Sequence, residues 1–351
     1  MDRHTVDIYE AKAHEYVAAR TTKAMSVAHE LRELSPAGVR LDLGSGPGWY
    51  TAELGGPSVA LDAARSMLER TDPTLPRVQA DLNALPFRDG AAVAAFANRS
   101  YVHVPTRALP MALWDLQRVL QVGAPVRLML FEGEHDGPFD NDDLGSRFFG
   151  LHPRERMHDL AVGAGFSDVE VGSRGDDTAL VVRANRARTL ADTVGGGMRL
   201  LMVGLNPSLY AADVGVGFAR PGNRFWPALA GAGIGDCTRD PRALLAAHHI
   251  GMTDLVKRAS AGADELTADE YREGLARLDR LCSWLRPVAV CFLGLAGWRA
   301  AVERQATTGW QRVSVGGCPV YVMPNPSGLN AHDTIASLAD HLRHALDEPP
   351  T

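Results

Sequence analysis

The fold is decided first by residues 39–48, VRLDLGSGPG, in which a short strand-like run leads directly into a glycine-rich turn. A helix is expected to follow from Trp49 to Leu54. Glycines in such a turn let the backbone approach a ligand closely and open the next helix toward it. The spacing is G-x-G-x-G rather than the dinucleotide G-x-G-x-x-G. The stretch therefore predicts an α/β domain with a nucleotide-type pocket.

Acidic residues end the strand-like segments that follow. SVALD ends in Asp62, twenty residues after Asp42, and VQADL contains Asp81. An acid at a strand end can accept hydrogen bonds from both hydroxyls of a ribose, and we predict this role for Asp62. We predict that Asp81 meets an adenine amino group and that Leu82 packs on the ring.

The same strand-then-loop pattern opens again at residues 199–208, RLLMVGLNPS, and a second Asn-Pro-Ser loop lies in residues 322–330, VMPNPSGLN. The prolines stiffen both loops, and each asparagine presents an amide at the carboxyl end of a strand, where ligands bind in open α/β sheets. Two amides suit the edge of a pyrimidine, because that edge carries donors and acceptors. Phe218 can stack on such a ring, and Leu329 can wedge into a base stack.

Length and composition fit a two-domain globular protein. The chain has 351 residues, 46% of them hydrophobic, which excludes a mostly disordered chain. We predict a first domain over residues 1–185, a linker over residues 186–197 that includes three consecutive glycines, and a second domain over residues 198–351.

The sequence also argues against several classes of protein. No apolar stretch is long enough to span a membrane, and the N-terminal residues lack the apolar core of a signal peptide, so a cytoplasmic protein is expected. Four cysteines without a C-x-x-C pair predict neither a disulfide framework nor a zinc or iron–sulfur site. The net charge of −6 does not indicate a generic nucleic-acid coat protein, although a local basic patch can still bind DNA.

The first half resembles class I S-adenosylmethionine-dependent methyltransferases. The resemblance runs through LDLGSGPGWYTAEL, ALDAARSML, VQADLNALPF and LAVGAGFSDVEV, and covers about residues 7–183. It implies a Rossmann-like, seven-stranded, mainly parallel sheet and S-adenosyl-L-methionine as cofactor. By the same resemblance, the cofactor-binding residues are Asp42, Gly44, Gly46 and Gly48 on the methionine side, Asp62 at the ribose, and Asp81 and Leu82 at the adenine.

The methyl acceptor stays open. The loop expected to face it reads Asn98-Arg99-Ser100-Tyr101, with neither the Asn-Pro-Pro-Tyr type of tetrad of amino-methylating DNA enzymes nor the Pro-Cys pair of cytosine-C5 enzymes. DNA methylation is therefore disfavoured, and a small-molecule or nucleoside acceptor is favoured. The opening IYEAKAHEYVAAR resembles the helical lid of methyltransferases that act on small molecules.

The second half resembles the mismatch-specific uracil-DNA and thymine-DNA glycosylases, in their bacterial mismatch-specific uracil-DNA glycosylase branch. Five blocks agree in order: GLNPS, FARPGNRFW, GMTDLVKR, CFLGLAGW and VMPNPSGLN. The resemblance implies a three-layer α/β/α domain that acts on double-stranded DNA with G·U or related mispairs. It implies that Asn206 positions the attacking water, that Phe218 and Asn325 hold the base, that Leu329 fills the vacated gap, and that Gly328 and Asn330 meet the opposite guanine.

The residue types limit the chemistry. A carboxamide cannot accept a proton at neutral pH, so Asn206 can orient water but cannot act as a strong base. We therefore expect slow hydrolysis that favours bases leaving easily as anions, such as uracil. Neither loop contains a lysine, so we expect an intact strand with an abasic site. Affinity for DNA is expected from arginines such as Arg220, Arg224 and Arg258, while Thr253 and Asp254 are expected to be structural.

The leading interpretation is thus a monofunctional DNA repair glycosylase fused to a methyltransferase of unknown acceptor, acting in the cytoplasm and on the nucleoid. One alternative is a non-catalytic reader that binds mispaired or methylated DNA. Another makes the methyltransferase the main enzyme and the glycosylase-like half its DNA-targeting module. The sequence leaves open the order of preference among uracil, thymine and other lesions, the reason for the fusion and the oligomeric state.

Overall fold

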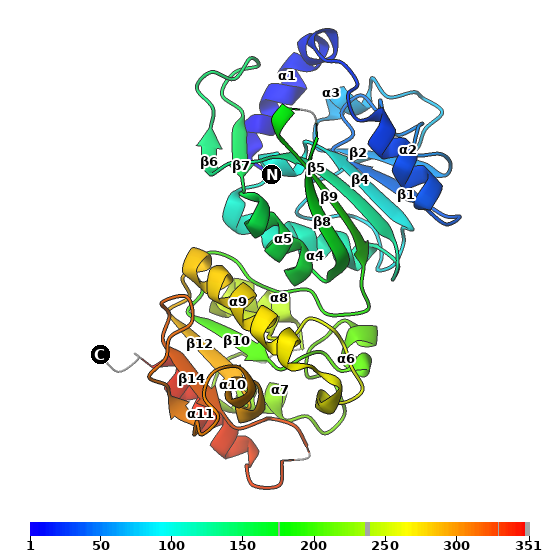
Figure 1. Ribbon diagram of the computed structural model, residues 1–351. Helices are drawn as coiled ribbons and strands as arrows, with labels where there is room; N and C mark the ends of the chain where they lie inside the picture. The colour runs from blue at the N-terminus through cyan, green and yellow to red at the C-terminus, as the bar shows by residue number, and fades with distance from the viewer. Residues whose placement is uncertain (175, 236–238, 329, 348–351) are drawn as a thin grey trace. The chain divides into compact units, whose positions relative to one another are not determined.

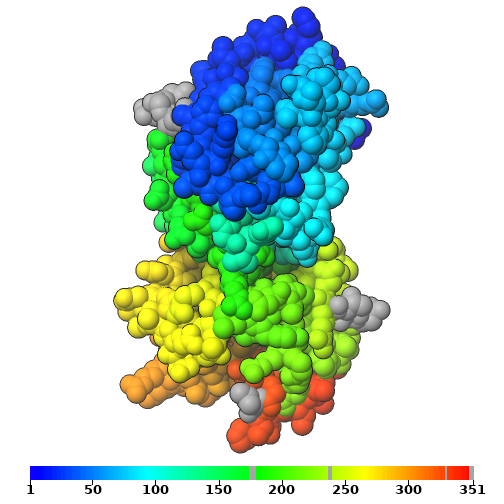
Figure 2. Space-filling model, turned by 90° about the vertical axis from the view of Figure 1, so that its right-hand side faces the viewer, coloured from blue at the N-terminus to red at the C-terminus, as the bar shows by residue number. Residues whose placement is uncertain are grey.

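The computed structural model describes residues 1–174, 176–235, 239–328 and 330–347. The chain divides into two compact units, Met1–Ala187 and Arg188–Thr351. Figure 2 shows the surface of each unit, coloured blue to green for the first and green to red for the second. Among the described residues, no helix has the length and apolar character needed to cross a membrane.

The first unit is built on a seven-stranded sheet with the strand order β3-β2-β1-β4-β5-β9-β8 (Figure 1). The first five of these strands are parallel, while β9 runs antiparallel to both of its neighbours. The strands are β1 (Arg40–Leu43), β2 (Ser58–Asp62), β3 (Arg77–Gln79), β4 (Ala94–Asn98), β5 (Pro125–Phe131), β8 (Phe166–Arg174) and β9 (Asp176–Arg186).

Helices and a hairpin complete the first unit. Val27, Ala28 and Leu31 of α2 pack on β4 and β5 in one apolar cluster with Phe96 and Met129. The elements are α1 (Arg3–Ala19), α2 (Met25–Leu34), α3 (Arg65–Leu68), α4 (Leu109–Val119) and α5 (Arg154–Gly163), with 3-10 turns η1 (Tyr101–His103) and η2 (Thr106–Ala108) and the hairpin β6 (His135–Pro138) and β7 (Phe148–Leu151).

The prediction of a helix from Trp49 to Leu54 is wrong, because these residues form successive turns. Only the bond from the Leu54 amide to the Tyr50 carbonyl has helical spacing. The chain then meets Gly55, Gly56 and Pro57, which offer no helical continuation. A segment this short cannot offset the cost of nucleating a regular helix.

The second unit contains a five-stranded sheet with the order β11-β10-β12-β14-β13. Its four long strands are parallel, and the short edge strand β13 is antiparallel. The strands are β10 (Leu200–Gly204), β11 (Ile250–Asp254), β12 (Ala289–Leu293), β13 (Gly309–Trp310) and β14 (Val320–Met323). The helices are α6 (Leu209–Val214), α7 (Phe225–Gly231), α8 (Pro241–His248), α9 (Ala268–Leu285), α10 (Leu295–Ala301) and α11 (Ile335–Leu346), with the 3-10 turn η3 (Ala263–Glu265).

Both faces of this sheet are covered, because side chains along a strand alternate between the faces. Leu201 and Val203 join a core with α9 and α10, whereas Leu200 and Met202 join a separate core with α7 and α11. Because both faces are buried, the sequences of these strands are continuous apolar runs, as is typical of parallel sheets. The predicted fold class is confirmed: a Rossmann-like, seven-stranded domain and a three-layer α/β/α domain.

The chain between the sheets joins the second unit from Arg188 onward. Thr193 exchanges backbone hydrogen bonds with Met252 of β11, and Val194 and Met198 enter the core beneath α9. Most of the segment predicted as a linker is therefore packed against the second sheet. The exact domain boundaries stay a prediction.

Candidate functional site

In the first unit, β1 lies between β2 and β4, so the strand order reverses there. Ligands of open α/β sheets bind at the carboxyl ends of the strands at such a point. A cavity lies at this edge. Its lining residues are Met1, Tyr9, Tyr16, Gly44, Gly46, Leu61, Asp62, Ala63, Met67, Ala80, Leu82, Asn98, Arg99, Ser100 and His103.

The glycine turn after β1 forms one wall of the cavity. Gly44 has φ +67°, and a Cβ atom there would lie 2.2 Å from Cβ of Ser100, so this position requires glycine. The amide of Gly46 donates to Oδ2 of Asp62 over 2.8 Å. The turn is thus held against the end of β2 by the acid that the sequence singles out.

Asp62 is the central acid of this cavity. Its Oδ1 accepts from the Ala64 amide over 2.9 Å. Burial raises the pKa of Asp62 to about 6, although backbone amides lower it. Each carboxylate oxygen has two lone pairs and can accept more than one bond, so Asp62 keeps acceptor capacity for ribose hydroxyls. This arrangement fits the cofactor that the resemblance implies.

The predicted cofactor residues divide into two groups. Gly44, Gly46, Asp62 and Leu82 line the cavity, while Asp42, Gly48 and Asp81 are not part of its lining. Asp42 lies beneath the turn, where Thr51 donates to its carboxylate over 2.6 Å, and burial raises its pKa to about 7. Both oxygens of Asp81 accept from the amino group of Met1 at 2.8 Å.

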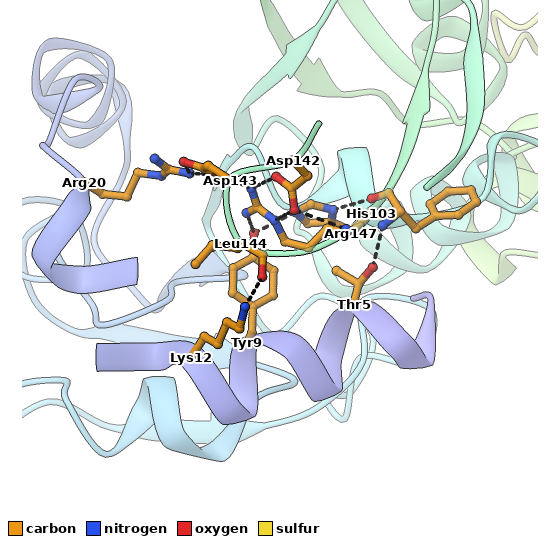
Figure 3. A network of polar contacts seen from close by, with 10 residues as sticks. Thr5, Tyr9, Lys12, Arg20, His103, Asp142, Asp143, Leu144 and Arg147 are labelled. Atoms are coloured by element: carbon orange, nitrogen blue, oxygen red, sulfur yellow. Dashed lines mark hydrogen bonds and ion pairs between the residues drawn. The ribbon is translucent and has the colours of Figure 1, made fainter. Parts of the chain in front are cut away.

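A polar network joins α1 to the segment before β7 (Figure 3). The Tyr9 hydroxyl accepts from Arg147 over 2.6 Å and lies 2.9 Å from Nε2 of His103. Nδ1 of His103 lies 2.7 Å from the Phe148 carbonyl, which can only accept, so Nδ1 carries the proton and Nε2 accepts from Tyr9. Burial lowers the pKa of His103 to about 4, and the ring is therefore neutral at physiological pH.

Further contacts fix α1 over the cavity edge. Thr5 accepts from the Phe148 amide over 2.8 Å, Lys12 donates to the Leu144 carbonyl over 2.8 Å, and Arg20 pairs with Asp143 (Figure 3). Tyr9 and Tyr16 of the same helix line the cavity.

In the second unit, Asn206 follows β10 with its carboxamide oriented by three acceptors. Its Nδ2 donates to Oγ of Ser260 over 2.8 Å, to the Arg258 carbonyl over 3.0 Å and to the Pro207 carbonyl over 3.2 Å. The donors of Nδ2 are therefore used in hydrogen bonds within the protein. Oδ1 has no hydrogen bond within the part of the chain that the structure describes, and it can accept one from water.

Phe218 lies beside the end of the same strand. It has φ +57°, a backbone conformation that is rare for a bulky residue, and such conformations cluster at functional sites. Its ring centroid lies 4.4 Å from that of Phe225. A Cβ atom on Gly204 would lie 3.3 Å from Cζ of Phe218, so the glycine makes room for the ring. Phe218 is only half-buried, which leaves part of the ring available for stacking.

The loop after β14 projects at the same edge. Asn325 is exposed, its Oδ1 accepts from the Ser327 amide over 2.9 Å, and its carbonyl accepts from Asn330 over 3.0 Å. Gly294 after β12 has φ +116°, and a Cβ atom there would lie 3.2 Å from Cβ of Asn325. Gly328 packs close to the Gly222 carbonyl. Leu329, the predicted wedge, lies outside the described residues.

Strand order brings the two asparagine loops together. β12 is the neighbour of both β10 and β14, and all three are parallel. Neighbouring strands lie about 4.8 Å apart, so β10 and β14 are roughly 10 Å apart at the edge where both loops emerge. Asn206 and Asn325 therefore open at one edge of one sheet.

Asp254 also belongs to this edge, although the sequence predicts a structural role for it. It ends β11 in register with Gly204, and a Cβ atom on that glycine would lie 2.4 Å from its Oδ1. Burial raises the pKa of Asp254 to about 6. Beneath it, Arg277 donates to the Asp254 carbonyl over 3.0 Å and pairs with buried Asp192 over 2.7 Å. The rule that pointed to Asp62, an acid at the carboxyl end of a parallel strand, would also have found Asp254.

The three arginines expected to bind DNA differ in their surroundings. Arg224 donates to the carbonyls of Ser327, Asn330 and Asp333, so it braces the Asn325 loop. Arg258 pairs with Glu270 over 2.6 Å. Arg220 is exposed and has no partner among the described residues. It is the one of the three that is free to contact phosphate.

The fold defines a protein of two α/β domains. In each domain, candidate binding residues lie at the carboxyl ends of parallel strands. Comparison with known families then identifies the domains. Residues 41–127 match the family described as Methyltransferase domain, and residues 193–348 match the Uracil DNA glycosylase superfamily. The chain therefore carries a methyltransferase domain and a uracil DNA glycosylase superfamily domain, as the sequence motifs predicted. The mismatch-specific branch stays a prediction.

Solved structures similar to the chain include several methyltransferases. A putative methyltransferase of Haloferax volcanii, in complex with the Trm112 activator, is 16% identical over 52% of this chain and 97% of its own, with a TM-score of 0.44. A possible histamine N-methyltransferase of Thermotoga maritima is 17% identical over 52% of this chain and 100% of its own, with a TM-score of 0.42. DhpI in complex with SAH is 21% identical over 52% and 95%, with a TM-score of 0.45.

Proposed function

We propose that the second domain hydrolyses the N-glycosidic bond of uracil, or of a related mispaired pyrimidine, opposite guanine in duplex DNA. The observation that carries the proposal is the convergence of three loops at one sheet edge. One presents Oδ1 of Asn206, one presents the ring of Phe218, and one presents the exposed carboxamide of Asn325. The superfamily match supports the same reaction.

In this proposal, the extruded base stacks on Phe218 and meets the carboxamide of Asn325. Oδ1 of Asn206 accepts a hydrogen bond from a water molecule, whose oxygen then bonds to C1′ of the sugar. The C1′–N bond breaks and its electron pair leaves with the base. The proton of the water has to be taken up, and Asn206 cannot accept it.

Asp254 is suited to receive this proton. With a pKa of about 6, the carboxylate is mostly ionised at neutral pH. This pKa is also close enough to neutral pH for the group to accept a proton efficiently. Its strand partner is Gly204, which is two positions before Asn206 in the chain, so both residues belong to the same edge of the sheet. We propose that Asp254 supplies this base.

The test is a duplex oligonucleotide with one G·U mispair, heated in alkali after incubation so that abasic sites become strand breaks. Wild-type protein should produce breaks only after the alkali step. Asn206→Ala and Asp254→Asn should each reduce them strongly. Absence of breaks with wild-type protein, or equal breakage by Asn206→Ala, would favour a non-catalytic reader of mispaired DNA instead.

The cavity of the first domain supports a second activity. We propose that this domain binds S-adenosyl-L-methionine, with Gly44 and Gly46 along its backbone, Asp62 at the ribose hydroxyls and Leu82 on the adenine. When bound, the cofactor supplies an electrophilic methyl group. Calorimetric titration with S-adenosylhomocysteine tests this role, and Asp62→Ala should abolish the binding.

A further inference from the structure

Arg99 directly follows β4 and lines the cavity of the first domain. It lies next to the glycine turn, since Ser100 is the residue that excludes a side chain at Gly44. Its backbone has φ +57°, outside the region that a long side chain prefers. A strained residue at the carboxyl end of a switch-point strand is well placed to contact the molecule that receives the methyl group.

The guanidinium of Arg99 lies over an aromatic ring, and no acid among the described residues balances its charge. Its guanidinium lies 4.5 Å from the centroid of the Phe131 ring, which orients it without neutralising it. It forms no ion pair with an acid within the described part of the chain. Of the other ionisable groups in the lining, Asp62 is held by the amides of Gly46 and Ala64, and His103 is neutral. The amino group of Met1 pairs with Asp81, and burial raises the pKa of Tyr9 and Tyr16.

The helix α1 limits what can pair with Arg99. Its Tyr9 and Tyr16 line the same cavity as Arg99, so the acceptor has to fit beside this helix and the cofactor. The contacts from Thr5, Lys12 and Arg20 to residues 143–148 hold α1 across this edge (Figure 3). This arrangement favours a small molecule over a nucleobase that is still attached to a DNA strand.

We infer that the methyl acceptor is a small molecule that carries a carboxylate or phosphate-type anion, which Arg99 binds. Arginine suits such groups because its planar fork donates two parallel hydrogen bonds to them. In the reaction, a lone pair of the acceptor forms a bond to the methyl carbon while the carbon–sulfur bond breaks, and its electrons stay on sulfur. The acceptor then releases a proton if its nucleophilic atom carried one. This inference rests on the proposed methyltransferase function and specifies its substrate class.

The test uses benzoate and phenylphosphonate as anionic probes and benzamide as their uncharged counterpart. Calorimetric titrations are made on the full-length protein with S-adenosylhomocysteine present. Wild-type protein should bind at least one anion, and Arg99→Gln should weaken that binding about 10-fold or more, as loss of a charge-assisted contact requires. Arg99→Lys should restore part of it. Binding of benzamide should not change.

Arg107→Gln is the matched control, because Arg107 is exposed, belongs to the same domain and does not line the cavity. It should bind the anions like wild type. Equal binding of benzoate and benzamide, no effect of Arg99→Gln, or no binding of either anion would overturn the inference. Titration of S-adenosylhomocysteine alone separates the two proposals. If wild-type protein binds it and the anions still fail, only the acceptor class is wrong.

Discussion

The carboxamide of Asn206 has a different role at each end. Its nitrogen is held by Ser260 and the Arg258 carbonyl, which leaves Oδ1 for water. Asn206→Ala removes the acceptor and should lower the single-turnover rate on G·U duplex by at least about 100-fold. Ser260→Ala removes only one anchor and should cost less, about 10-fold. Equal losses in the two variants would show that Oδ1 has no special role.

Asp254 makes stability depend on pH in a definite direction. Its pKa is raised from 3.8 to about 6, so the folded protein holds a proton that the unfolded chain releases. Stability from this group is complete below about pH 4 and is lost as the pH rises through about 6. Asp254→Asn should therefore stabilise the domain at pH 8, by up to about 3 kcal/mol, and have little effect at pH 4. Urea denaturation of both proteins at the two pH values checks this.

The same carboxyl group should govern the pH profile of base excision. Because the ionised form accepts the proton, the single-turnover rate should rise as the pH passes through about 6 and then level off. In Asp254→Asn the low residual rate should lack this step. A wild-type rate that is flat from pH 5 to pH 8 would contradict the role of Asp254 as the proton acceptor.

At the scale of elements, the loop after β14 depends on Arg224. Three loop carbonyls accept from this side chain, and the Arg224 amide donates to the Pro326 carbonyl over 2.9 Å. Arg224→Met keeps the length but removes the donors. We expect slower excision with an unchanged dependence of DNA affinity on salt, measured by fluorescence anisotropy.

Arg220→Met provides the contrast, since this exposed arginine is free to neutralise a phosphate. It should weaken DNA binding and reduce the slope of log affinity against log salt by about one. A change of slope in the Arg224 variant, and none in the Arg220 variant, would reverse the assignment of the two residues.

The sequence predicted much of each edge because strand ends and loops are encoded locally. The glycine turn, Asp62 and both Asn-Pro-Ser loops follow apolar runs that form parallel strands. What it missed depends on packing. The side chain of Asp42 is buried against Thr51 rather than in the cavity, and Arg224 and Arg258 are used by neighbouring protein groups. The partners of Arg224 lie 103 to 109 residues away, beyond the reach of a local pattern. Those of Asp42 and Arg258 lie only 9 and 12 residues away, but the pairing depends on how the intervening chain folds.

At the scale of the whole molecule, each domain has its own sheet and core. A ligand of one domain should stabilise that domain, because binding shifts the unfolding equilibrium by mass action. In calorimetry, S-adenosylhomocysteine at about 100 times its dissociation constant should stabilise the first domain by about 2.7 kcal/mol. Asp62→Ala should remove the shift. A shift that persists in this variant would show that Asp62 does not hold the ligand.

The central claim is that Asn206, Phe218 and Asn325 form one site that releases a pyrimidine from DNA. Mass spectrometry of the free bases liberated from a G·U duplex tests it most directly, with wild-type protein and Asn206→Ala in parallel. We predict free uracil from the wild type, in an amount that matches the abasic sites formed, and almost none from the variant. If wild-type protein binds the duplex and liberates no base, the site is not that of a glycosylase.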